Sequence, residues 1–484
     1  MILKDLIGGL DVIAAKGNLN IEISSVAYDS RKVKPGSLFI CIKGYKTNGH
    51  EYIPYALRNG AAALVVEEDT QIEEAVSIIK VKDSRLALAY VSDKYFGHPS
   101  GKFTLIGVTG TKGKTTTTYM IKAILEESGQ KVGLIGTIAN SIGGEVLYTE
   151  RTTPESYELQ SLFAEMAAKN VDTVVMEVSS HALELNRVSF SDYDIGIFTN
   201  LSRDHLDFHK SFENYLNAKI KLFKISKEGL VNIDNTYGEE VFKRAECRLT
   251  SYGIDKNADI SAEGIINNPD SVEFKAVTPW GNERVKVNIP GKFSVYNALA
   301  AIGACSLMNI PMDDIREGLK KVSVPGRAEI IDTGKDFTVM IDYAHSPDSL
   351  ENILSTVKKY APARVVCVFG CGGDRDRTKR PIMGEISGRL ADYTIVTSDN
   401  PRTEEPEEII SEIEEGIKGL RADYTTIVDR REAIKHAITH AEPKDIIVLA
   451  GKGHETYQTF KDKTIHFDER EVVREILNKG KNQL

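Results

Sequence analysis

The sequence contains few cysteines, and their spacing matches neither a zinc site nor a disulfide framework. The 484 residues include 5 of them, namely Cys41, Cys247, Cys305, Cys367 and Cys371. Cys367 and Cys371 fall in one short segment, but no second pair of cysteines or histidines completes a zinc-binding pattern. Scattered thiols of this kind are typical of a reducing compartment, so we predict reduced cysteines in a cytosolic protein.

Long apolar runs and an excess of basic residues are also absent. No uncharged apolar stretch reaches the roughly 20 residues that a membrane-spanning helix requires. The N-terminal segment MILKDLIGGLDVIAAKG is interrupted by Asp5 and Asp11 and lacks a cleavage-site pattern. The net charge of −9 opposes non-specific binding to a phosphate backbone. These absences predict a cytoplasmic protein with no membrane span and no nucleic-acid partner.

The composition itself is that of a globular protein with more than one domain. Hydrophobic residues make up 41% and charged residues 27% of the chain, which is ordinary for such proteins. A chain of 484 residues exceeds what a single hydrophobic core usually supports. Turn-forming residues cluster at Gly97–Phe103 and again at Val322–Ile330. We therefore predict three domains, at residues 1–98, 99–325 and 326–484.

Each of the three segments has an α/β pattern. The first mixes short strands with a helical stretch, and the second begins with the strand FTLIGVTG running into the helix TTTTYMIKAILEESG. In the third, four apolar runs each end in a polar or glycine-rich loop: TVMIDYAH, RVVCVFGCGG, DYTIVTSDN and DIIVLAGKG. Such alternation predicts parallel sheets with helices on their faces. Ligands then bind beyond the carboxyl ends of the strands.

Residues 107–118 read GVTGTKGKTTTT and have the context of a phosphate-binding loop. Gly110 and Gly113 let backbone N–H groups approach phosphate oxygens, and the helix that follows adds its positive end. Lys114 can reach the outer phosphates, and the Thr115 hydroxyl is placed for Mg²⁺. Val108 stands where the strict motif has glycine. A glycine-rich turn without ligand is the alternative, but the coincidence of strand, GKT and helix start favours ATP or GTP.

Polar side chains that could bind a metal follow the next two predicted strands. Glu177 ends the apolar run VVMEV, where an unpaired carboxylate would be costly. Beyond IGIFTNL come Asp204, His205, Asp207 and His209. Mg²⁺ prefers oxygen ligands, and a single histidine is more often structural. Proximity to Glu177 and the phosphate loop leaves the two interpretations of His205 evenly balanced.

Lys219 is the one charged member of an apolar helical stripe. That stripe, in FENYLNAKIKLF, consists of Phe212, Tyr215, Leu216, Lys219, Ile220 and Phe223. Lys219 therefore faces inward, whereas Lys221 lies off the stripe. A lysine that extends its ammonium group to solvent is the ordinary explanation. The functional alternative is a lysine with an altered charge state close to the site.

The segment SDNPRTEEPEE, residues 398–408, follows a predicted strand and precedes a predicted helix. Asn-Pro initiates turns, and Asp399, Asn400 and Thr403 are typical loop and cap residues. Taken alone, the segment is most simply a strand-to-helix turn. The alternative is that Asp399, Asn400 and Arg402 bind a ligand.

Together these segments resemble the Mur ligases, the ATP-dependent amide-forming enzymes of peptidoglycan synthesis. The matching segments occur in the family's order over nearly the whole chain. They are YDSRKVKPGSLFICIKG (28–44), GTKGKTTT (110–117), RTTPES (151–156), MEVSSHAL (176–183), NLSRDHLDFH (200–209), Lys219, YNALAAIGA (296–304), PGRAE (325–329), DYAHSPDSL (342–350), FGCGGDRDRTKRP (369–381), SDNPRTEEP (398–406) and LAGKGHETYQ (449–458).

The resemblance implies a fold, a reaction and partners. The fold is an N-terminal α/β UDP-binding domain, a central P-loop-type ATPase domain with a parallel sheet, and a C-terminal Rossmann-like domain. DNPR, residues 399–402, is as in the members that add meso-2,6-diaminopimelate to UDP-N-acetylmuramoyl-L-alanyl-D-glutamate. In that reaction ATP activates the D-glutamate carboxylate as an acyl phosphate, which the incoming amine attacks. ATP is the co-substrate, Mg²⁺ the cofactor, and a monomer is expected.

The resemblance also implies four sets of site residues. The ATP-binding set is Gly110, Thr111, Lys112, Gly113, Lys114, Thr115, Thr116, Asn297, Arg327, Asp342 and His345. Thr115, Glu177, His205 and a carbamylated Lys219 (N6-carboxylysine) are implied as metal ligands, and Lys114, Glu177, His205 and Lys219 as catalytic. Ser30, Thr152, Thr153, Ser179 and Arg187 correspond to the UDP-sugar-peptide site, where Leu185 departs from some relatives. Arg375, Asp399, Asn400, Pro401, Arg402, Gly451 and Glu455 correspond to the diaminopimelate site.

Four alternatives remain, and two of them keep the ligase chemistry. An L-lysine-adding ligase shares everything but the selecting loop, since an arginine pairs with the second carboxylate of diaminopimelate and is penalised beside the lysine ammonium. A folylpolyglutamate-synthase-like ligase would lack YDSRKVKPGSLF and DNPR. A P-loop NTPase module would turn over nucleotide without an amino acid. A non-catalytic scaffold would not be expected to retain Lys114, Glu177, His205 and Lys219 together.

Overall fold

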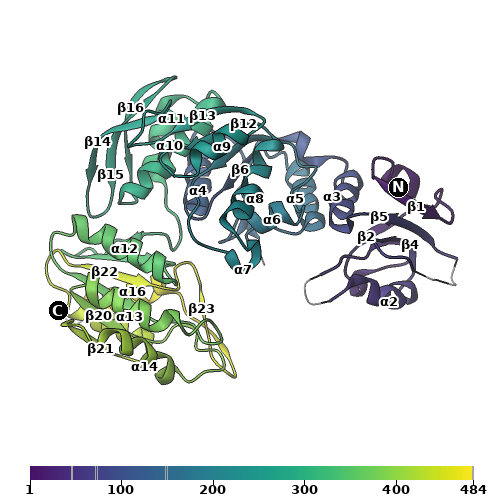
Figure 1. Ribbon diagram of the computed structural model, residues 1–484. Helices are drawn as coiled ribbons and strands as arrows, with labels where there is room; N and C mark the ends of the chain where they lie inside the picture. Colours follow the sequence, from purple (N-terminus) through teal and green to yellow (C-terminus); the bar gives the residue numbers. More distant parts are fainter. Residues whose placement is uncertain (45–46, 71, 73–74, 148, 150, 482–484) are drawn as a thin grey trace. The chain divides into compact units, whose positions relative to one another are not determined.

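The computed structural model describes residues 1–44, 47–70, 72, 75–147, 149 and 151–481 (Figure 1). The chain divides into two compact units. The first comprises Met1–Ser261 and Leu299–Ile315, and the second comprises Ala262–Ala298 and Arg316–Leu484. The boundaries at residues 98 and 325 that we expect from the sequence stay predictions. None of the helices in the described ranges has the length and apolar character to span a bilayer.

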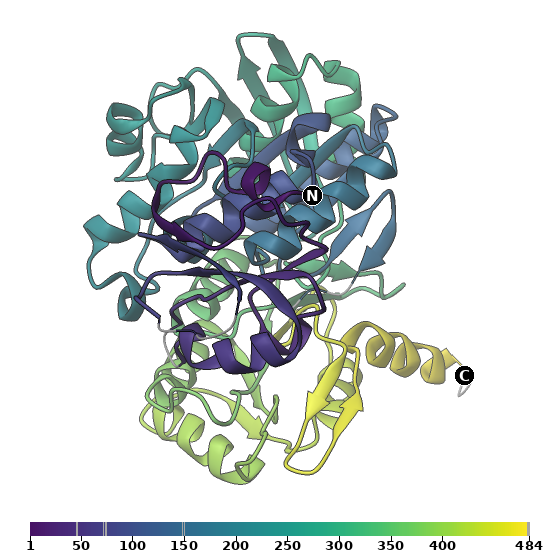
Figure 2. The same cartoon turned by 90° about the vertical axis from the view of Figure 1, so that its right-hand side faces the viewer.

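The first unit begins with a five-stranded sheet, coloured purple in Figures 1 and 2. Its order is β1-β5-β4-β3-β2, parallel except for the pair β1 and β5. The strands are β1 (Val12–Lys16), β2 (Ser25–Ala27), β3 (Ser37–Ile40), β4 (Ala61–Val66) and β5 (Ser77–Val81). Residues of α2 (Ile53–Arg58) pack on one face, and those of α1 (Leu3–Leu6) and α3 (Ser84–Tyr95) on the other. Three short 3₁₀ turns, η1 (Ser30–Lys32), η2 (Gly49–Tyr52) and η3 (Pro99–Lys102), complete the segment.

An eight-stranded sheet follows, in the order β13-β12-β11-β6-β10-β7-β8-β9. Its strands are β6 (Thr104–Thr109), β7 (Val132–Ile135), β8 (Asn140–Ile142), β9 (Glu145–Leu147), β10 (Thr173–Glu177), β11 (Tyr193–Phe198), β12 (Ser226–Asn232) and β13 (Arg248–Tyr252). All neighbours from β13 to β7 are parallel, as expected from the apolar runs, while β8 and β9 add an antiparallel edge. Since β6 lies between β10 and β11, the loops that follow these three strands meet at one edge.

The helices of this sheet are amphipathic and bury their apolar sides. They are α4 (Lys114–Glu127), α5 (Ser156–Ala168), α6 (Ser180–Glu184), α7 (Leu206–His209), α8 (Phe212–Lys224) and α9 (Gly238–Arg244). The predicted stripe of α8 is confirmed, because Tyr215, Leu216, Ile220 and Phe223 lie in the core cluster while Phe212 packs at its margin. Ser211 caps the helix by accepting a hydrogen bond from the Asn214 N–H.

A separate sheet of three strands, in which β15 and β16 pair antiparallel, was not expected from the sequence. It consists of β14 (Ser261–Asn267), β15 (Val272–Thr278) and β16 (Gly281–Val287), followed by α10 (Lys292–Leu307) and α11 (Met312–Lys321). β15 alternates between buried and more accessible residues, the pattern of a sheet with one covered face. Trp280 stands at the β15–β16 turn and is 40% exposed.

The C-terminal sheet has six strands in the order β17-β18-β22-β19-β20-β21. They are β17 (Glu329–Ile331), β18 (Thr338–Asp342), β19 (Val365–Phe369), β20 (Tyr393–Val396), β21 (Tyr424–Thr426) and β22 (Ile446–Ala450). Only β17 pairs antiparallel, so the four apolar runs expected from the sequence are confirmed as parallel strands. Because β19 pairs with both β20 and β22, the loops after these strands lie together.

Helices cover both faces of this sheet, and a hairpin follows its β22 strand. The helices are α12 (Pro347–Tyr360), α13 (Lys379–Leu390), α14 (Pro406–Ile417), α15 (Arg430–Thr439) and α16 (Glu469–Lys481). α15 and α16 share one core cluster with the strands, whereas α12, α13 and α14 contact one another. The hairpin is formed by β23 (Tyr457–Thr459) and β24 (Thr464–His466).

Candidate functional site

The predicted phosphate loop joins β6 to α4, as expected. Gly113 precedes the helix with φ 87°, a conformation that favours glycine. The Lys114 ammonium donates to the carbonyl oxygens of Gly110 at 2.9 Å and Thr111 at 3.1 Å. The lysine is thus folded over its own loop, beside the N-terminus of a 14-residue helix. Positive charge and free helical N–H groups meet there, the arrangement that binds phosphate.

The loop after β11 holds the phosphate loop in place. Asn200 accepts hydrogen bonds from the backbone N–H groups of Thr111 and Lys112, both at 2.9 Å, through its carbonyl and its side chain respectively. Its amide donates back to the Lys112 carbonyl at 3.0 Å, and the Thr199 hydroxyl donates to the same oxygen at 2.6 Å. A Cβ on Gly110 would lie 1.8 Å from the Thr199 hydroxyl. Asn200 and Thr199 were not singled out from the sequence, although Asn200 opens a motif that was.

Glu177 ends β10 and is almost completely buried, at 1% exposure. Its carboxylate accepts from the Thr115 hydroxyl at 3.0 Å, and from the Thr137 backbone N–H at 2.8 Å and hydroxyl at 3.1 Å. Two residues predicted as metal ligands, Glu177 and Thr115, are therefore hydrogen-bonded to each other, and Thr116 is also buried. Thr137, in the loop after β7, is a partner that the sequence did not reveal. Hydroxyl and carboxylate oxygens of this kind suit Mg²⁺.

Lys219 is 1% exposed and lies in the middle of α8. Its ammonium nitrogen lies 4.5 Å from the centre of the Tyr215 ring and makes no hydrogen bond or ion pair within the described part of the chain. Burial, reinforced by the charge of Lys114 and opposed by Asp204, lowers the pKa of Lys219 far below the usual lysine value. Burial at this position therefore favours the uncharged amine over the ammonium form. Lys221, off the stripe, forms an exposed ion pair with Glu184 at 2.7 Å.

His205 precedes α7 with φ 52° and is about half exposed. Partial burial lowers its pKa, although the Asp204 carboxylate 3.6 Å from Nδ1 opposes this. Its ring lies 4.9 Å from that of His181 and 6.2 Å from that of Tyr215. Tyr215 therefore touches both His205 and Lys219, and its hydroxyl reaches the Thr111 hydroxyl at 3.1 Å. Tyr215 therefore connects the phosphate loop with His205 and Lys219. The sequence did not indicate this role, because Tyr215 belongs to an apolar helical stripe.

The other two residues of this loop behave differently. His209 is 4% exposed and its Nε2 lies 2.9 Å from the Ser180 hydroxyl, and burial lowers its pKa to about 4. Asp207 stands in the first turn of α7. Over the residues that the structure describes, no three His, Cys, Asp or Glu side chains gather as a ready metal site. A metal here would depend on hydroxyl, phosphate or added carboxylate oxygens.

Three of the predicted sugar-peptide residues surround Glu177. The Thr153 hydroxyl donates to the Glu177 carbonyl at 2.8 Å and accepts from the Ser179 N–H at 3.0 Å. The hydroxyl of Thr152 lies 3.0 Å from that of Thr137. Ser179 also caps α6. Polar groups for a second substrate thus lie beside the expected metal position.

Arg187 joins this group through the Thr153 carbonyl, 3.4 Å from its Nη1. Its Nε lies 3.2 Å from the carboxylate of Glu155, which is buried and also within 3.7 Å of Arg85 and Arg151. Burial is the main cause that lowers the pKa of Arg187. Three cations around one carboxylate leave net positive charge, which suits an anionic substrate.

Ser30 lies apart from these four residues, at the start of η1, where its carbonyl accepts from the Asn59 amide at 2.9 Å. Asn297 belongs to α10, where its side chain is buried at 6% exposure. The second unit contains Asn297 together with Arg327, Asp342 and His345, whereas residues 110–116 of the predicted nucleotide set belong to the first unit.

Arg327, Asp342 and His345 gather around Tyr343. The Arg327 guanidinium lies 5.1 Å from the Tyr343 ring centre, and the His345 ring lies 4.4 Å from it. The Asp342 carboxylate accepts from the backbone N–H of the residue after Arg327 at 2.8 Å. Burial raises the pKa of Asp342, against the lowering effect of Arg327. These contacts bring together three of the four residues expected around ATP in this unit.

The loop after β20 begins with two buried polar residues. Asp399 and Asn400 are 8% and 2% exposed. The Asn400 amide donates to Glu455 at 2.8 Å, and the Lys452 ammonium donates to both Asn400 and Glu455 at 3.3 and 3.1 Å. Gly451 has φ 116°, and a Cβ there would lie 2.8 Å from the Asp399 carboxylate. The predicted residues 399, 400, 451 and 455 are thus neighbours, joined by Lys452, which was missed.

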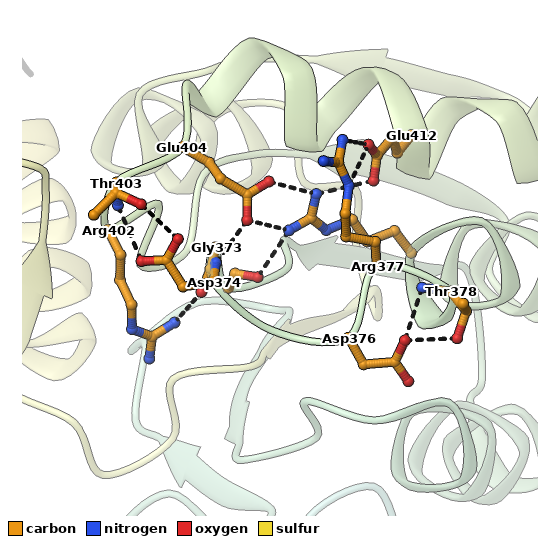
Figure 3. Close-up of polar contacts among 11 residues, drawn as sticks. Gly373, Asp374, Asp376, Arg377, Thr378, Arg402, Thr403, Glu404 and Glu412 are labelled. Carbon is orange, nitrogen blue, oxygen red and sulfur yellow. Dashed lines mark hydrogen bonds and ion pairs between the residues drawn. The ribbon is translucent and has the colours of Figure 1, made fainter.

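Arg402 and Arg375 flank the glycines that follow β19. Arg402 has φ 54°, donates its backbone N–H to Thr459 at 3.0 Å, and donates Nη1 to the Gly373 carbonyl at 2.7 Å (Figure 3). A Cβ on Gly372 would lie 2.8 Å from Arg402 Nη1 and 3.8 Å from Arg375 Cγ. Arg375 is exposed, and Pro401 between Asn400 and Arg402 is buried. Two arginines therefore belong to the loops that adjoin the hydrogen-bonded cluster of Asn400, Lys452 and Glu455.

Three family models match the chain, in an order that follows its segments. "Mur ligase family, catalytic domain" matches residues 22–96, "Mur ligase middle domain" matches 108–305, and "Mur ligase, glutamate ligase domain" matches 326–453. The first match covers the segment that a folylpolyglutamate-synthase-like chain would lack.

Curated relatives and a solved structure extend over almost the whole chain. The chain is 51% identical over 478 residues to the UDP-N-acetylmuramoyl-L-alanyl-D-glutamate–2,6-diaminopimelate ligase of Caldanaerobacter subterraneus subsp. tengcongensis, covering 99% of both. It is 52% identical over 462 residues to the ligase of the same name from Clostridium botulinum, covering 94% of this chain and 95% of that one. A solved structure of a ligase with this name superposes with a TM-score of 0.75 at 31% identity, covering 99% of both chains.

Proposed function

Because the chain belongs to the Mur ligase family, we propose that it is the ligase that adds meso-2,6-diaminopimelate to UDP-N-acetylmuramoyl-L-alanyl-D-glutamate with ATP. The observation that carries this choice of amino acid is the pair Arg375 and Arg402 beside buried Asp399 and Asn400 and the half-buried Glu455. These side chains offer cations for one carboxylate and anions for an ammonium group. The names of the relatives support the same substrate pair.

The reaction requires activation of a carboxylate. A D-glutamate carboxylate oxygen attacks the γ-phosphorus of ATP, and the bond to ADP breaks to leave an acyl phosphate. The diaminopimelate amine then attacks the carbonyl carbon, a tetrahedral intermediate forms and expels phosphate, and the nitrogen loses a proton. Direct amide formation would require oxide as leaving group, which the acyl phosphate avoids. Positive charge is needed throughout, since the transferring phosphoryl group and the carboxylate are both anionic.

The phosphate loop supplies much of that charge. On nucleotide binding we expect the Lys114 ammonium to exchange its bonds with Gly110 and Thr111 for phosphate oxygens. The backbone N–H groups of residues 110–116 would bind the phosphates nearest the helix. In the second unit, Asn297, Arg327, Asp342 and His345 are proposed to contact the same nucleotide.

Mg²⁺ fits the oxygen donors of Thr115 and Glu177, and when bound it would offset charge on the phosphoryl oxygens. A second ion would use His205 and Lys219 as a carbamate. Support for the carbamate comes from the burial of the Lys219 amine, which has no hydrogen-bond partner in the described residues and has its pKa lowered by that burial. The uncharged amine that burial favours is the form that adds CO₂. The carbamate is an anionic oxygen ligand. An ammonium group at the same position would be positively charged and could not bind a metal ion.

The two organic substrates are assigned to two groups of residues. Thr152, Thr153, Ser179 and Arg187 would bind the sugar-peptide, with Ser30 toward its uridine end. Arg402 and Arg375 would pair with the far carboxylate of diaminopimelate, while Asp399, Asn400, Pro401, Gly451 and Glu455 surround its amino-acid head. An arginine guanidinium can make two parallel hydrogen bonds to a carboxylate. L-lysine as substrate has no second carboxylate to accept them. A cytoplasmic location and a monomeric state remain predictions.

An amino-acid panel tests the proposal. Phosphate release is measured with the full chain, ATP, Mg²⁺ and the UDP-dipeptide, adding meso-diaminopimelate or L-lysine. We expect release that requires both co-substrates and is far faster with diaminopimelate. Equal rates with the two amino acids would refute the selection, and release without any amino acid would favour an NTPase module.

A further inference from the structure

Two loops of the C-terminal sheet, residues 370–378 after β19 and 397–405 after β20, are joined backbone to backbone. The Gly373 N–H donates to the Asn400 carbonyl at 2.9 Å, and Arg402 returns a bond to the Gly373 carbonyl at 2.7 Å. A Cβ at Gly373 would lie 1.9 Å from the Pro401 carbonyl oxygen, so only glycine permits this approach. The loops that carry Arg375 and Arg402 are therefore in direct contact.

Side chains add a second connection at Asp374. Its carboxylate accepts from the Thr403 hydroxyl at 2.5 Å and from the Thr403 N–H at 3.3 Å, and its own N–H donates to Glu404 at 2.6 Å (Figure 3). Asp374 and Arg402 both have φ 54°, an uncommon backbone conformation for residues other than glycine. Such conformations persist only where surrounding contacts hold them.

The strongest connection is a fully buried arginine. Arg380, in the first turn of α13 and 0% exposed, donates to both carboxylate oxygens of Glu404 at 2.9 Å, to Glu412 at 2.9 Å and to the Gly372 carbonyl at 3.4 Å. This pairing lowers the pKa of Glu404 to about 2. Removing one partner of a buried pair leaves the other without compensation, which is strongly destabilising locally.

The position of this network indicates its purpose. Arg380 lies in the first turn of α13, directly after the first loop, and Glu404 lies in the second loop, two residues after Arg402. Arg402 uses only Nη1 on Gly373, and its other guanidinium nitrogens make no hydrogen bond in the described ranges. The network thus fixes the base of the Arg402 side chain while one side of its guanidinium stays available.

We propose that Arg380 and Glu404 are positioning residues for amino-acid selection, holding Arg402 and Arg375 at the spacing that one carboxylate of diaminopimelate requires. The inference rests on the proposed function. Neither residue is proposed to touch the substrate. A displacement of about 1 Å at a binding group can cost up to a hundredfold in rate, so a loosened pair of loops should affect one substrate selectively.

The test compares Arg380→Lys with a matched control in the full-length chain. Lysine keeps the charge but cannot bond Glu404, Glu412 and Gly372 in the planar geometry of a guanidinium. The control is Arg364→Lys, because Arg364 donates two hydrogen bonds to the carboxylate of buried Asp445. Both residues directly precede strands, at the amino ends of β19 and β22, whereas the two loops follow the carboxyl ends of β19 and β20. Glu404→Gln, which retains the shape of the side chain, serves as a second variant should Arg380→Lys fail to fold.

We expect Arg380→Lys to raise the KM for meso-diaminopimelate about tenfold, with the KM for ATP and for the UDP-dipeptide changed less than about twofold. The preference for diaminopimelate over L-lysine, as a ratio of kcat/KM, should fall by about the same tenfold factor. Glu404→Gln should shift the same two quantities in the same direction, and Arg364→Lys should shift neither.

Other outcomes overturn the inference. If the KM for diaminopimelate is unchanged, or if the KM rises equally for all three substrates, Arg380 contributes to stability alone. The same conclusion follows if Arg364→Lys produces the same shift. If the unsubstituted chain releases no phosphate with diaminopimelate, the proposed function fails instead. The two failures are distinguished by the unsubstituted chain.

Discussion

The phosphate loop after β6 and the selecting loop after β20 occupy equivalent places in their sheets but are built differently. The first is held through its main chain: Lys114 bonds to carbonyls three and four residues earlier, and Asn200 of the loop after β11 bonds to its backbone groups. The second is held by bonds between side chains of different segments, such as Arg380 with Glu404 and Asn400 with Glu455.

The difference reflects what each loop has to recognise. A phosphate group is bound by N–H groups that every residue carries, so a contiguous glycine-rich segment is sufficient. An amino acid with a second carboxylate must be told from one with an ammonium group, which demands charged side chains in fixed places. Charges in fixed places require partners on other elements. If this is correct, changes near the phosphate loop should affect the nucleotide and metal, and changes in the selecting loop should affect the amino acid.

The largest effect is expected at Lys219, near the phosphate loop. Lys219→Ala should lower phosphate release by about a hundredfold or more, because a proposed oxygen ligand is lost. Short-chain carboxylic acids added to the assay should restore part of the rate by supplying an oxygen. Lys221→Ala, on the same helix, is the control and should keep the rate. A fully active Lys219→Ala protein would remove the carbamate from the mechanism.

Arg402→Ala should come next and should act on one substrate only. Loss of charged hydrogen bonds to a carboxylate is worth about 1.5–3 kcal/mol, so the KM for diaminopimelate should rise roughly 10- to 100-fold. The KM for ATP should stay the same, since the phosphate loop is built independently. Steady-state kinetics with each substrate varied in turn measures both. A fall in ATP affinity would mean that the selecting loop has a structural role. It would also refute the separation between the phosphate loop and the selecting loop.

A smaller effect is expected at Thr137, whose hydroxyl supports Glu177 beside Thr115. Thr137→Val removes this donor and keeps the backbone one, so the Mg²⁺ concentration for half-maximal rate should rise about tenfold. Thr137→Ser retains the hydroxyl and should match the unsubstituted chain. If valine leaves the Mg²⁺ requirement unchanged while serine alters it, the hydroxyl does not act on the metal position.

The smallest effect concerns acid stability of the selecting loop. Arg380 lowers the pKa of Glu404 from 4.5 to about 2, so the ionised carboxylate favours the folded state. That stabilisation is complete above about pH 4.5 and disappears as pH falls toward 2. The melting temperature of Glu404→Gln should therefore be lower than that of the unsubstituted chain near neutral pH, and the two should converge across this range. A constant difference down to pH 2 would contradict the pairing.

The same contrast explains what could be predicted from the sequence. The phosphate loop, the parallel strands and the inward Lys219 depend on neighbours within one element or one turn, and all three were expected. Thr137, Asn200, Lys452 and Arg380 act through contacts between loops that only the folded sheet brings together. Asp399, Asn400 and Arg402 were singled out because of a family resemblance, whereas turn chemistry alone favoured a simple loop. Patterns in a sequence reveal the local periodicity of one helix or strand. Contacts between loops at the edge of a sheet produce no such periodicity, so they could not be predicted.

The three-stranded sheet was missed for another reason. Residues 272–287 alternate as a hairpin does, with Thr-Pro-Trp-Gly between the two halves. Its accessible face carries charged residues, so the segment contains no continuous apolar run of the kind from which the parallel strands were predicted.

The hairpin turn has a practical consequence, because Trp280 is the sole tryptophan of the chain. It belongs to the second unit, whereas Cys247, the one partly accessible thiol among four buried ones, belongs to the first. A dye attached to Cys247 would label the first unit, while the indole reports on the second, without any engineered residue. The two fluorescence signals could then be recorded separately as nucleotide, sugar-peptide and amino acid are added in turn.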